Sequence, residues 1–166
     1  FAYQTYIQNN SLFRKENIMS EMKNFGVLTT TNKYVAELNK ENKSDSTLSG
    51  TMFDVAIQLM KDANNEHSNG KVWEYWFGFS NGYNFIHYND NDERLNAAAQ
   101  IFTILRKQWS DIKYKNFFLE MLAYIDLVEN KTSLAIESYQ KLVLNPSETL
   151  PITLKRSKEV LKRIDN

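Results

Sequence analysis

The stretch from Leu119 to Pro146 constrains the fold of this chain most, because it has the pattern of two short amphipathic helices joined by a polar turn. Apolar residues recur every three or four positions on both sides of the turn, as a helix with one buried face requires. Glu129, Asn130 and Lys131 interrupt this pattern. Pro146 ends the second helix, since proline disfavours helical geometry in the preceding residue. The stretch therefore predicts a helical hairpin that stacks on other helices.

This hairpin resembles the tetratricopeptide repeat, a helix-turn-helix unit of about 34 residues. In that family's pattern a bulky residue is followed by a small residue four positions later, as Leu119 is by Ala123. The pattern then has an alanine, an aromatic residue and a closing proline, and Ala135, Tyr139 and Pro146 match these positions. The resemblance implies antiparallel helical hairpins stacked as a short solenoid.

A fainter copy of the repeat lies upstream. Ala98, Phe102 and Leu105 repeat the order of small, aromatic and leucine residues at a constant offset of roughly 37 residues, which is within the period range of helical repeats. Asp126 departs from the family pattern, which often has an aromatic residue there. We expect two related hairpins in residues 71–166, closed by a C-terminal capping helix, and less regular helices in residues 1–70.

Composition supports an all-α fold of one domain. The chain has 166 residues, with five glycines and two prolines, and this scarcity of turn residues favours long helices over a β fold. Basic and acidic residues balance at 20 each, so no overall field attracts nucleic acid or an acidic membrane surface. Cysteine is absent, which excludes disulfides and thiolate chemistry. No apolar run is long enough to span a bilayer.

The stretch from Val72 to Tyr88 has two interpretations. At helical period, apolar and aromatic residues form a continuous stripe, and the offset to the downstream repeat favours this helix. At period two, aromatic segments flank Asn81 and Gly82, which form a strong β-hairpin signal. We expect the helix, because no other stretch predicts a strand that such a hairpin could join.

The last helix is expected to begin at Ser147 and Glu148 and to close the stack. Its apolar residues face inward: Leu150, Leu154, Val160, Leu161 and Ile164. Its basic residues are expected to coat the outside, as on the solvated face of a capping helix: Lys155, Arg156, Lys158, Lys162 and Arg163. A phosphate-binding patch is the alternative interpretation of this basic run.

The sequence offers little for catalysis or for a metal. His67 and His87 are the two histidines, and they are not at ligand spacing. The acidic stretch 89–93 lacks the central glycine and the final glutamate of a calcium loop. No hydrolase, phosphate-binding or dinucleotide-binding motif occurs. We therefore expect no catalytic residues, no metal and no cofactor.

The resemblance implies a protein that binds a peptide or protein partner on a concave face, which the first helix of each hairpin forms. The residues that fall on this face by position are Trp76, Phe79, Tyr83, Ile86, Glu120, Tyr124 and Leu127. Apolar partner side chains would be buried against the aromatic residues, with Glu120 orienting the partner. Tyrosine and tryptophan are enriched in such interfaces.

Two other functions stay open. The aromatic residues between Trp73 and Phe85 could form a self-interface, which would make the chain a structural or oligomerisation module. A helical enzyme or small-molecule binder would require a deep pocket with convergent polar groups.

The architecture also resembles bacterial membrane-anchored proteins related to the ancillary subunit of the SecYEG translocon. That resemblance implies an envelope or periplasmic location, with the cytoplasm as the alternative.

Overall fold

A computed structural model of the chain describes residues 14–41, 47–67 and 91–164. Across these ranges the regular structure is helical, which confirms the expected all-α class for this part of the chain. The elements are α2 (Lys15–Phe25), α3 (Val27–Glu41), α4 (Thr47–His67), α5 (Glu93–Gln108), α6 (Ile112–Val128), α7 (Thr132–Val143), the short 3-10 helix η3 (Pro146–Glu148) and α8 (Pro151–Ile164).

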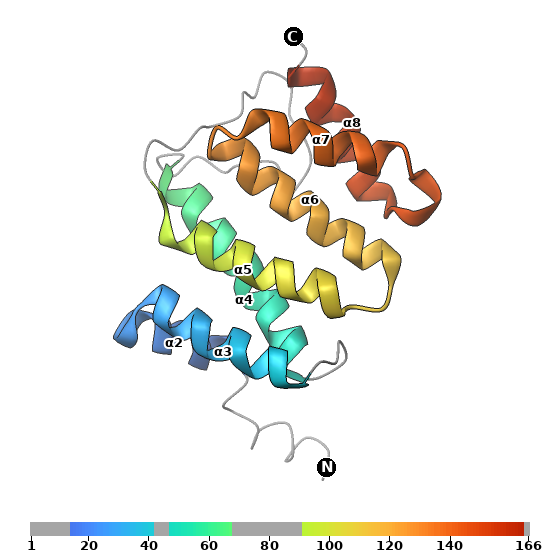
Figure 1. The fold of residues 1–166 in the computed structure, drawn as a ribbon. Coiled ribbons are helices and arrows are strands. Elements are labelled where there is room, and N and C mark those ends of the chain that lie inside the picture. The colour runs from blue at the N-terminus through green and yellow to red at the C-terminus, as the bar shows by residue number, and fades with distance from the viewer. Residues whose placement is uncertain (1–13, 42–46, 68–90, 165–166) are drawn as a thin grey trace.

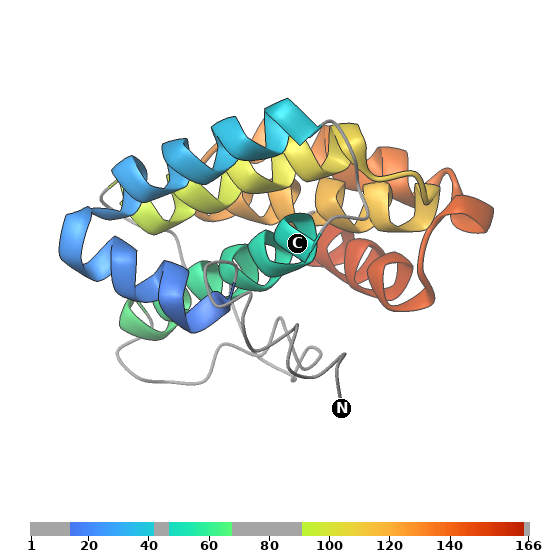
Figure 2. The same cartoon turned by 90° about the horizontal axis from the view of Figure 1, so that it is seen from below.

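Each helix packs against the next one in the chain, and three pairs of helices two apart also meet. These pairs are α2 with α4, α3 with α5, and α6 with α8. In Figure 1, α5, α6 and α7 lie side by side, with α4 behind α5 and α8 behind α7. Figure 2 shows α3 and α5 on one side of the molecule, with α2, α4 and α8 toward the other. Buried apolar residues from every α-helix within residues 14–41, 47–67 and 91–164 form one cluster.

Helix α6 lies at the centre of this packing, and its sequence explains why. It contacts α5, α7 and α8, so it needs apolar residues on more than one face. Phe118, Met121, Ala123 and Val128 are all fully buried along it. The most apolar of the described helices is therefore the one that is covered from several sides, as expected for a central helix.

Two tight connections set the directions of the helices. Gly26 ends α2 with a φ of 103°, a left-handed conformation that glycine adopts at little cost, and its N–H donates to the carbonyl of Met22. Asn130 has a φ of 66° in the turn between α6 and α7, and asparagine tolerates this conformation better than most residues. The polar turn expected at residues 129–131 is confirmed.

Some expected boundaries were wrong. The last helix begins at Pro151 instead of Ser147, because residues 146–148 form the 3-10 turn that separates α7 from α8. The polar sequence from Lys43 to Gly50 predicts a loop, but α4 begins at Thr47, so Gly50 lies inside the helix. The stretch from Val72 to Tyr88 lies outside the described residues, so the choice between helix and hairpin remains a prediction.

Candidate functional site

The predicted partner-binding residues divide into two groups. Trp76, Phe79, Tyr83 and Ile86 lie outside the described residues. Glu120, Tyr124 and Leu127 all belong to α6, and their exposed fractions are 0%, 1% and 1%. The three α6 side chains therefore belong to the protein interior and do not line an open surface.

Glu120 is buried because α8 supplies its partners. Arg156 donates to both carboxylate oxygens, with Nε 2.6 Å from Oε2 and a terminal nitrogen 2.7 Å from Oε1. The hydroxyl of Thr153 donates to Oε1 at 2.7 Å. A two-point contact of this kind matches the planar geometry of guanidinium and carboxylate. Glu120 thus joins α6 to α8 instead of orienting a partner.

Arg156 corrects the expectation for the basic run of α8. Its exposed fraction is 5%, whereas Lys155 and Lys158 are exposed as expected. Thr153, Arg156, Ser157 and Val160 share the buried face of the helix, with the spacing of three and four that one face requires. The sequence of a basic run does not show which of its residues will face a buried carboxylate on another helix.

Tyr124 is held in a similar way. Its hydroxyl lies 2.9 Å from Oδ1 of Asn64 on α4, and the contact is buried. A buried tyrosine hydroxyl needs such a partner, since leaving it without one costs free energy. Tyr124 therefore fixes α6 against α4.

An open groove lies elsewhere, between α3 and α5. One part has a volume of about 420 Å³, and its lining residues are Val35, Asn39, Asn96, Ala99, Gln100, Thr103, Ile104 and Lys107. The lining residues of α5 repeat at intervals of three and four, so they form one face of the helix. Figures 1 and 2 both show α3 and α5 side by side and running in the same direction. The groove therefore follows two parallel helices.

The floor and the rim of this groove differ in chemistry. Val35, Ala99 and Ile104 supply apolar surface and are half-buried or buried. Asn39 and Thr103 are exposed, so their polar groups face solvent. A hydrogen bond joins α5 to α3 near one end of the groove, where Nε2 of Gln108 donates to the carbonyl of Leu38 at 2.9 Å.

A second cavity of about 500 Å³ continues the groove at the beginning of α3 and α5. It shares Asn96 and Ala99 with the first part, and its other lining residues are Leu28, Asn91, Asp92, Glu93, Glu129 and Lys131. Asp92 caps α5 by accepting from the backbone N–H of Arg94 at 2.8 Å. Its carboxylate also pairs with the Arg94 guanidinium, which contacts Glu66 as well. This end of the groove is rich in carboxylates.

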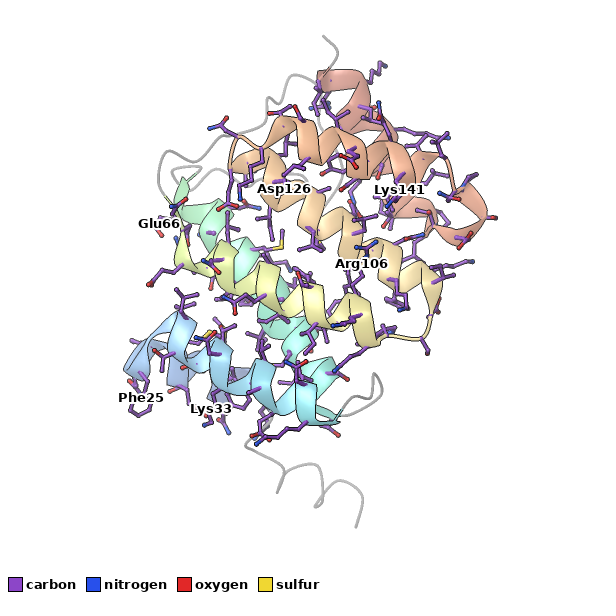
Figure 3. The ribbon with its side chains drawn as sticks, in the orientation of Figure 1. Phe25, Lys33, Glu66, Arg106, Asp126 and Lys141 are labelled. Atoms are coloured by element: carbon purple, nitrogen blue, oxygen red, sulfur yellow. The ribbon has the colours of Figure 1, made fainter. Side chains whose placement is uncertain are left out.

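Two carboxylates near this end are not in a favourable environment. Burial raises the pKa of Glu129, and the charges of Asp126 and Asp92 raise it further, while Lys131 at 3.9 Å opposes the shift. Burial also raises the pKa of Asp126. Figure 3 labels Asp126 on α6, together with Glu66, Arg106 and Lys141. Keeping Asp126 and Glu129 ionised in this partly buried place costs free energy, and Lys131 offsets part of it.

Aromatic residues gather at the opposite end of α4, α5 and α6. Phe53 stacks on Phe117 with ring centres 5.6 Å apart and meets the edges of Trp109 and Phe118. Tyr114 extends the cluster to the surface, where its exposed fraction is 40%. These contacts fix the bend between α5 and α6, with aromatic pairs that add to the burial of apolar surface.

Among the described residues, no group of three or more metal-ligating side chains could hold a metal ion. Over the same part of the chain, none of the helices combines the length and the apolar character that crossing a membrane requires. The sequence does not reveal the groove, because its α5 residues have the pattern of an ordinary solvated helix face. Only the packing of α3 beside α5 turns that face into one wall of a groove.

No protein-family model, curated protein or solved structure matches this chain.

Proposed function

We propose that this chain is a non-enzymatic scaffold that binds an extended segment of a peptide or protein partner in the groove between α3 and α5. The groove itself carries the proposal. It follows two parallel helices, it is open to solvent, and it combines an apolar floor with polar side chains at its rim. A bound peptide needs an apolar floor, because burial of its apolar side chains is favourable. It also needs a polar rim, because its backbone N–H and carbonyl groups must keep hydrogen-bond partners.

The amide side chains of the groove suit a peptide backbone. An amide presents both a donor and an acceptor, which are the two groups that each peptide unit offers. Asn96, Gln100 and Asn39 supply such groups from the two walls. Nε2 of Gln100 donates to Oδ1 of Asn96 at 2.9 Å, which leaves one further N–H and the carbonyl of Gln100 for a ligand.

The packing of the helices supports a repeat-like scaffold. Contacts between α2 and α4, between α3 and α5, and between α6 and α8 are those expected when hairpins α2–α3, α4–α5 and α6–α7 stack and α8 closes the stack. We infer a tetratricopeptide-like arrangement on this basis. The binding face in this proposal differs from the face expected from sequence, because Glu120, Tyr124 and Leu127 are buried.

The test uses random 12-residue peptides displayed on phage and selected on the 166-residue chain. Thr103→Trp places a large side chain at an exposed position of the groove without entering the core. We expect selected peptides to lose about tenfold or more in affinity for this variant, which corresponds to at least one well-packed contact. Fluorescence anisotropy with labelled peptides measures the affinities.

Gln140→Trp is the matched control, since Gln140 is also exposed on a helix but does not line the groove. This variant should bind the selected peptides as the wild type does. Equal binding by Thr103→Trp and wild type would contradict the proposal, and so would a selection that yields no binding peptide. Thermal unfolding of both variants checks that neither result reflects loss of fold.

Self-association is a second candidate function. Ile112, Leu144 and Ile152 have exposed fractions of 44%, 78% and 46%, and exposed apolar side chains of this size favour interfaces. Size-exclusion chromatography with light scattering distinguishes the two functions. A monomer that binds peptides supports the scaffold, whereas a dimer that Leu144→Asp converts to a monomer supports self-association.

A further inference from the structure

The two ends of the α3–α5 groove carry opposite charge. Asp92, Glu93 and Glu129 line the end where both helices begin. Lys107 lines the end where they finish. Asp92 is paired with Arg94, so the acidic end leaves two carboxylates, Glu93 and Glu129, with one lysine, Lys131. A segment that lies along the groove therefore meets a negative field at one end and a positive charge at the other.

Ordinary helix stabilisation explains only part of this arrangement. Asp92 and Glu93 stand at the beginning of α5, where negative charge offsets the positive end of the helix dipole. Glu129 stands at the opposite kind of position, since it caps the C-terminus of α6. A carboxylate is unfavourable there, and the last turn of α6 contains no basic residue. The stability of α6 therefore does not explain why a glutamate stands at position 129.

The surroundings of Glu129 make its charge more costly still. The groove end is partly buried, and Asp126 and Asp92 act on the same carboxylate. Arg94, the nearest guanidinium of α5, is already engaged by Asp92 and Glu66. Lys131, 3.9 Å away, lowers the pKa of Glu129 more than either neighbouring carboxylate raises it, but burial outweighs this attraction and keeps the pKa raised. A cation from outside the chain would favour the ionised, partly buried carboxylate while it binds.

We propose that the segment bound in this groove carries a lysine or arginine side chain at the end that faces Asp92, Glu93 and Glu129, and that the rest of the segment runs toward Lys107. This inference rests on the proposed function and adds the charge and the placement of the partner. Charge complementarity carries it, because opposite charges across an interface steer association and fix register. The apolar floor between the two ends accommodates the intervening side chains.

The experiment repeats the phage selection in parallel on wild type and on the double variant Glu93→Gln, Glu129→Gln. Both substitutions keep the size and polarity of the side chain and remove its charge. We expect peptides selected on wild type to be enriched in lysine and arginine at one end of the sequence. Their affinity for the double variant should fall about fivefold, and peptides selected on that variant should lack the enrichment.

A further substitution, Lys107→Gln, locates the other end of the segment. It should weaken peptides that carry an acidic residue far from their basic end and leave peptides without one unchanged. The inference fails if the selected peptides lose affinity for Thr103→Trp but show no basic enrichment, and in that case the proposed function stands. If the peptides bind Thr103→Trp normally, the proposed function itself fails. Unchanged affinity of basic peptides for the double variant also overturns the inference.

Discussion

The α6–α8 contact and the α3–α5 groove both place polar groups between helices, but only the first closes on itself. Glu120 and Arg156 bond to each other, and Thr153 completes the contact, all in the interior. In the groove, Asn39, Thr103 and other polar side chains face solvent. Polar groups in the first region therefore join two helices, whereas those of α5 in the second bond locally within that helix, as Thr103 does to the carbonyl of Ala99, and face solvent.

Two glutamates show the same contrast: Glu120 within α6, and Glu129 at the C-cap of that helix. Glu120 has a buried guanidinium in two-point contact, so its charge is matched within the fold. Glu129 has one lysine at 3.9 Å and further carboxylates nearby, so its charge is poorly matched. Glu120 therefore stabilises the fold through its partner, whereas the charge of Glu129 does not. Four variants test how these buried and half-buried polar groups contribute to stability.

Glu120→Ala should have the largest effect on stability. It leaves the Arg156 charge buried without its carboxylate, which typically costs about 3–5 kcal/mol. Urea unfolding followed by circular dichroism at 222 nm measures the change. The matched control is Glu37→Ala, which removes an exposed carboxylate paired with Lys40 at 3.4 Å and should change stability by less than about 0.5 kcal/mol. Equal losses in the two variants would contradict a structural role for Glu120.

Replacing both partners should cost much less than replacing one. In Glu120→Met with Arg156→Leu, no buried charge remains, and apolar side chains of similar size fill the space. Substitutions of this kind are often neutral or stabilising, so we expect stability within about 2 kcal/mol of wild type. Thr153 loses its acceptor in this variant, which limits the gain. A loss larger than that of Glu120→Ala would mean that the ion pair contributes net stability.

Much of the helical framework could be predicted from the sequence. The hairpin on both sides of Glu129–Lys131 was located because its apolar residues repeat at helical spacing and a polar turn interrupts them. Acidic residues suit the positive end of a helix, and Asp92 and Glu93 do stand at the beginning of α5. Such features depend on residues close in sequence. They could be found without knowing which helices are neighbours in space.

The candidate site could not be predicted in the same way, because it depends on contacts between distant segments. Glu120 was assigned to a partner-binding face by its position in a hairpin, and only the approach of Arg156 from α8 shows that it is buried. Thr103 and Lys107 have the pattern of a solvated face until α3 lies beside them. Periodicity reports which residues share a helix face, but not what covers that face.

Tyr124→Phe should have a smaller effect than either change at Glu120. It removes the hydroxyl that lies 2.9 Å from Asn64 in the interior and keeps the ring that fills the core. The loss of a buried hydrogen bond should cost about 1–2 kcal/mol. Tyr114→Phe is the control, because Tyr114 is exposed and should change stability by less than about 0.5 kcal/mol. No loss in Tyr124→Phe would show that this hydroxyl does not hold α6 to α4.

Glu129→Gln should have the smallest effect, and of opposite sign. The raised pKa means that the folded chain holds the proton of Glu129 more tightly than the unfolded chain, so the ionised carboxylate destabilises the fold above that pKa. The variant should therefore gain stability at pH 7–8, by at most about 0.5 kcal/mol because the group is partly solvated. The gain should vanish below the ordinary glutamate value of 4.5, where wild type is protonated in both states.

Urea unfolding of Glu129→Gln from pH 8 to pH 4 measures this trend, with Glu137→Gln as the exposed control on α7. A stability loss at pH 8 would mean that Glu129, like Glu120, is matched within the fold, and the acidic end of the groove would then give no reason to expect a basic partner. If Glu129→Gln is more stable than wild type at pH 8, and a saturating basic peptide removes this difference, the stability measurement and the peptide affinity report the same charge. The charge that destabilises the free chain would be the charge that a basic side chain binds.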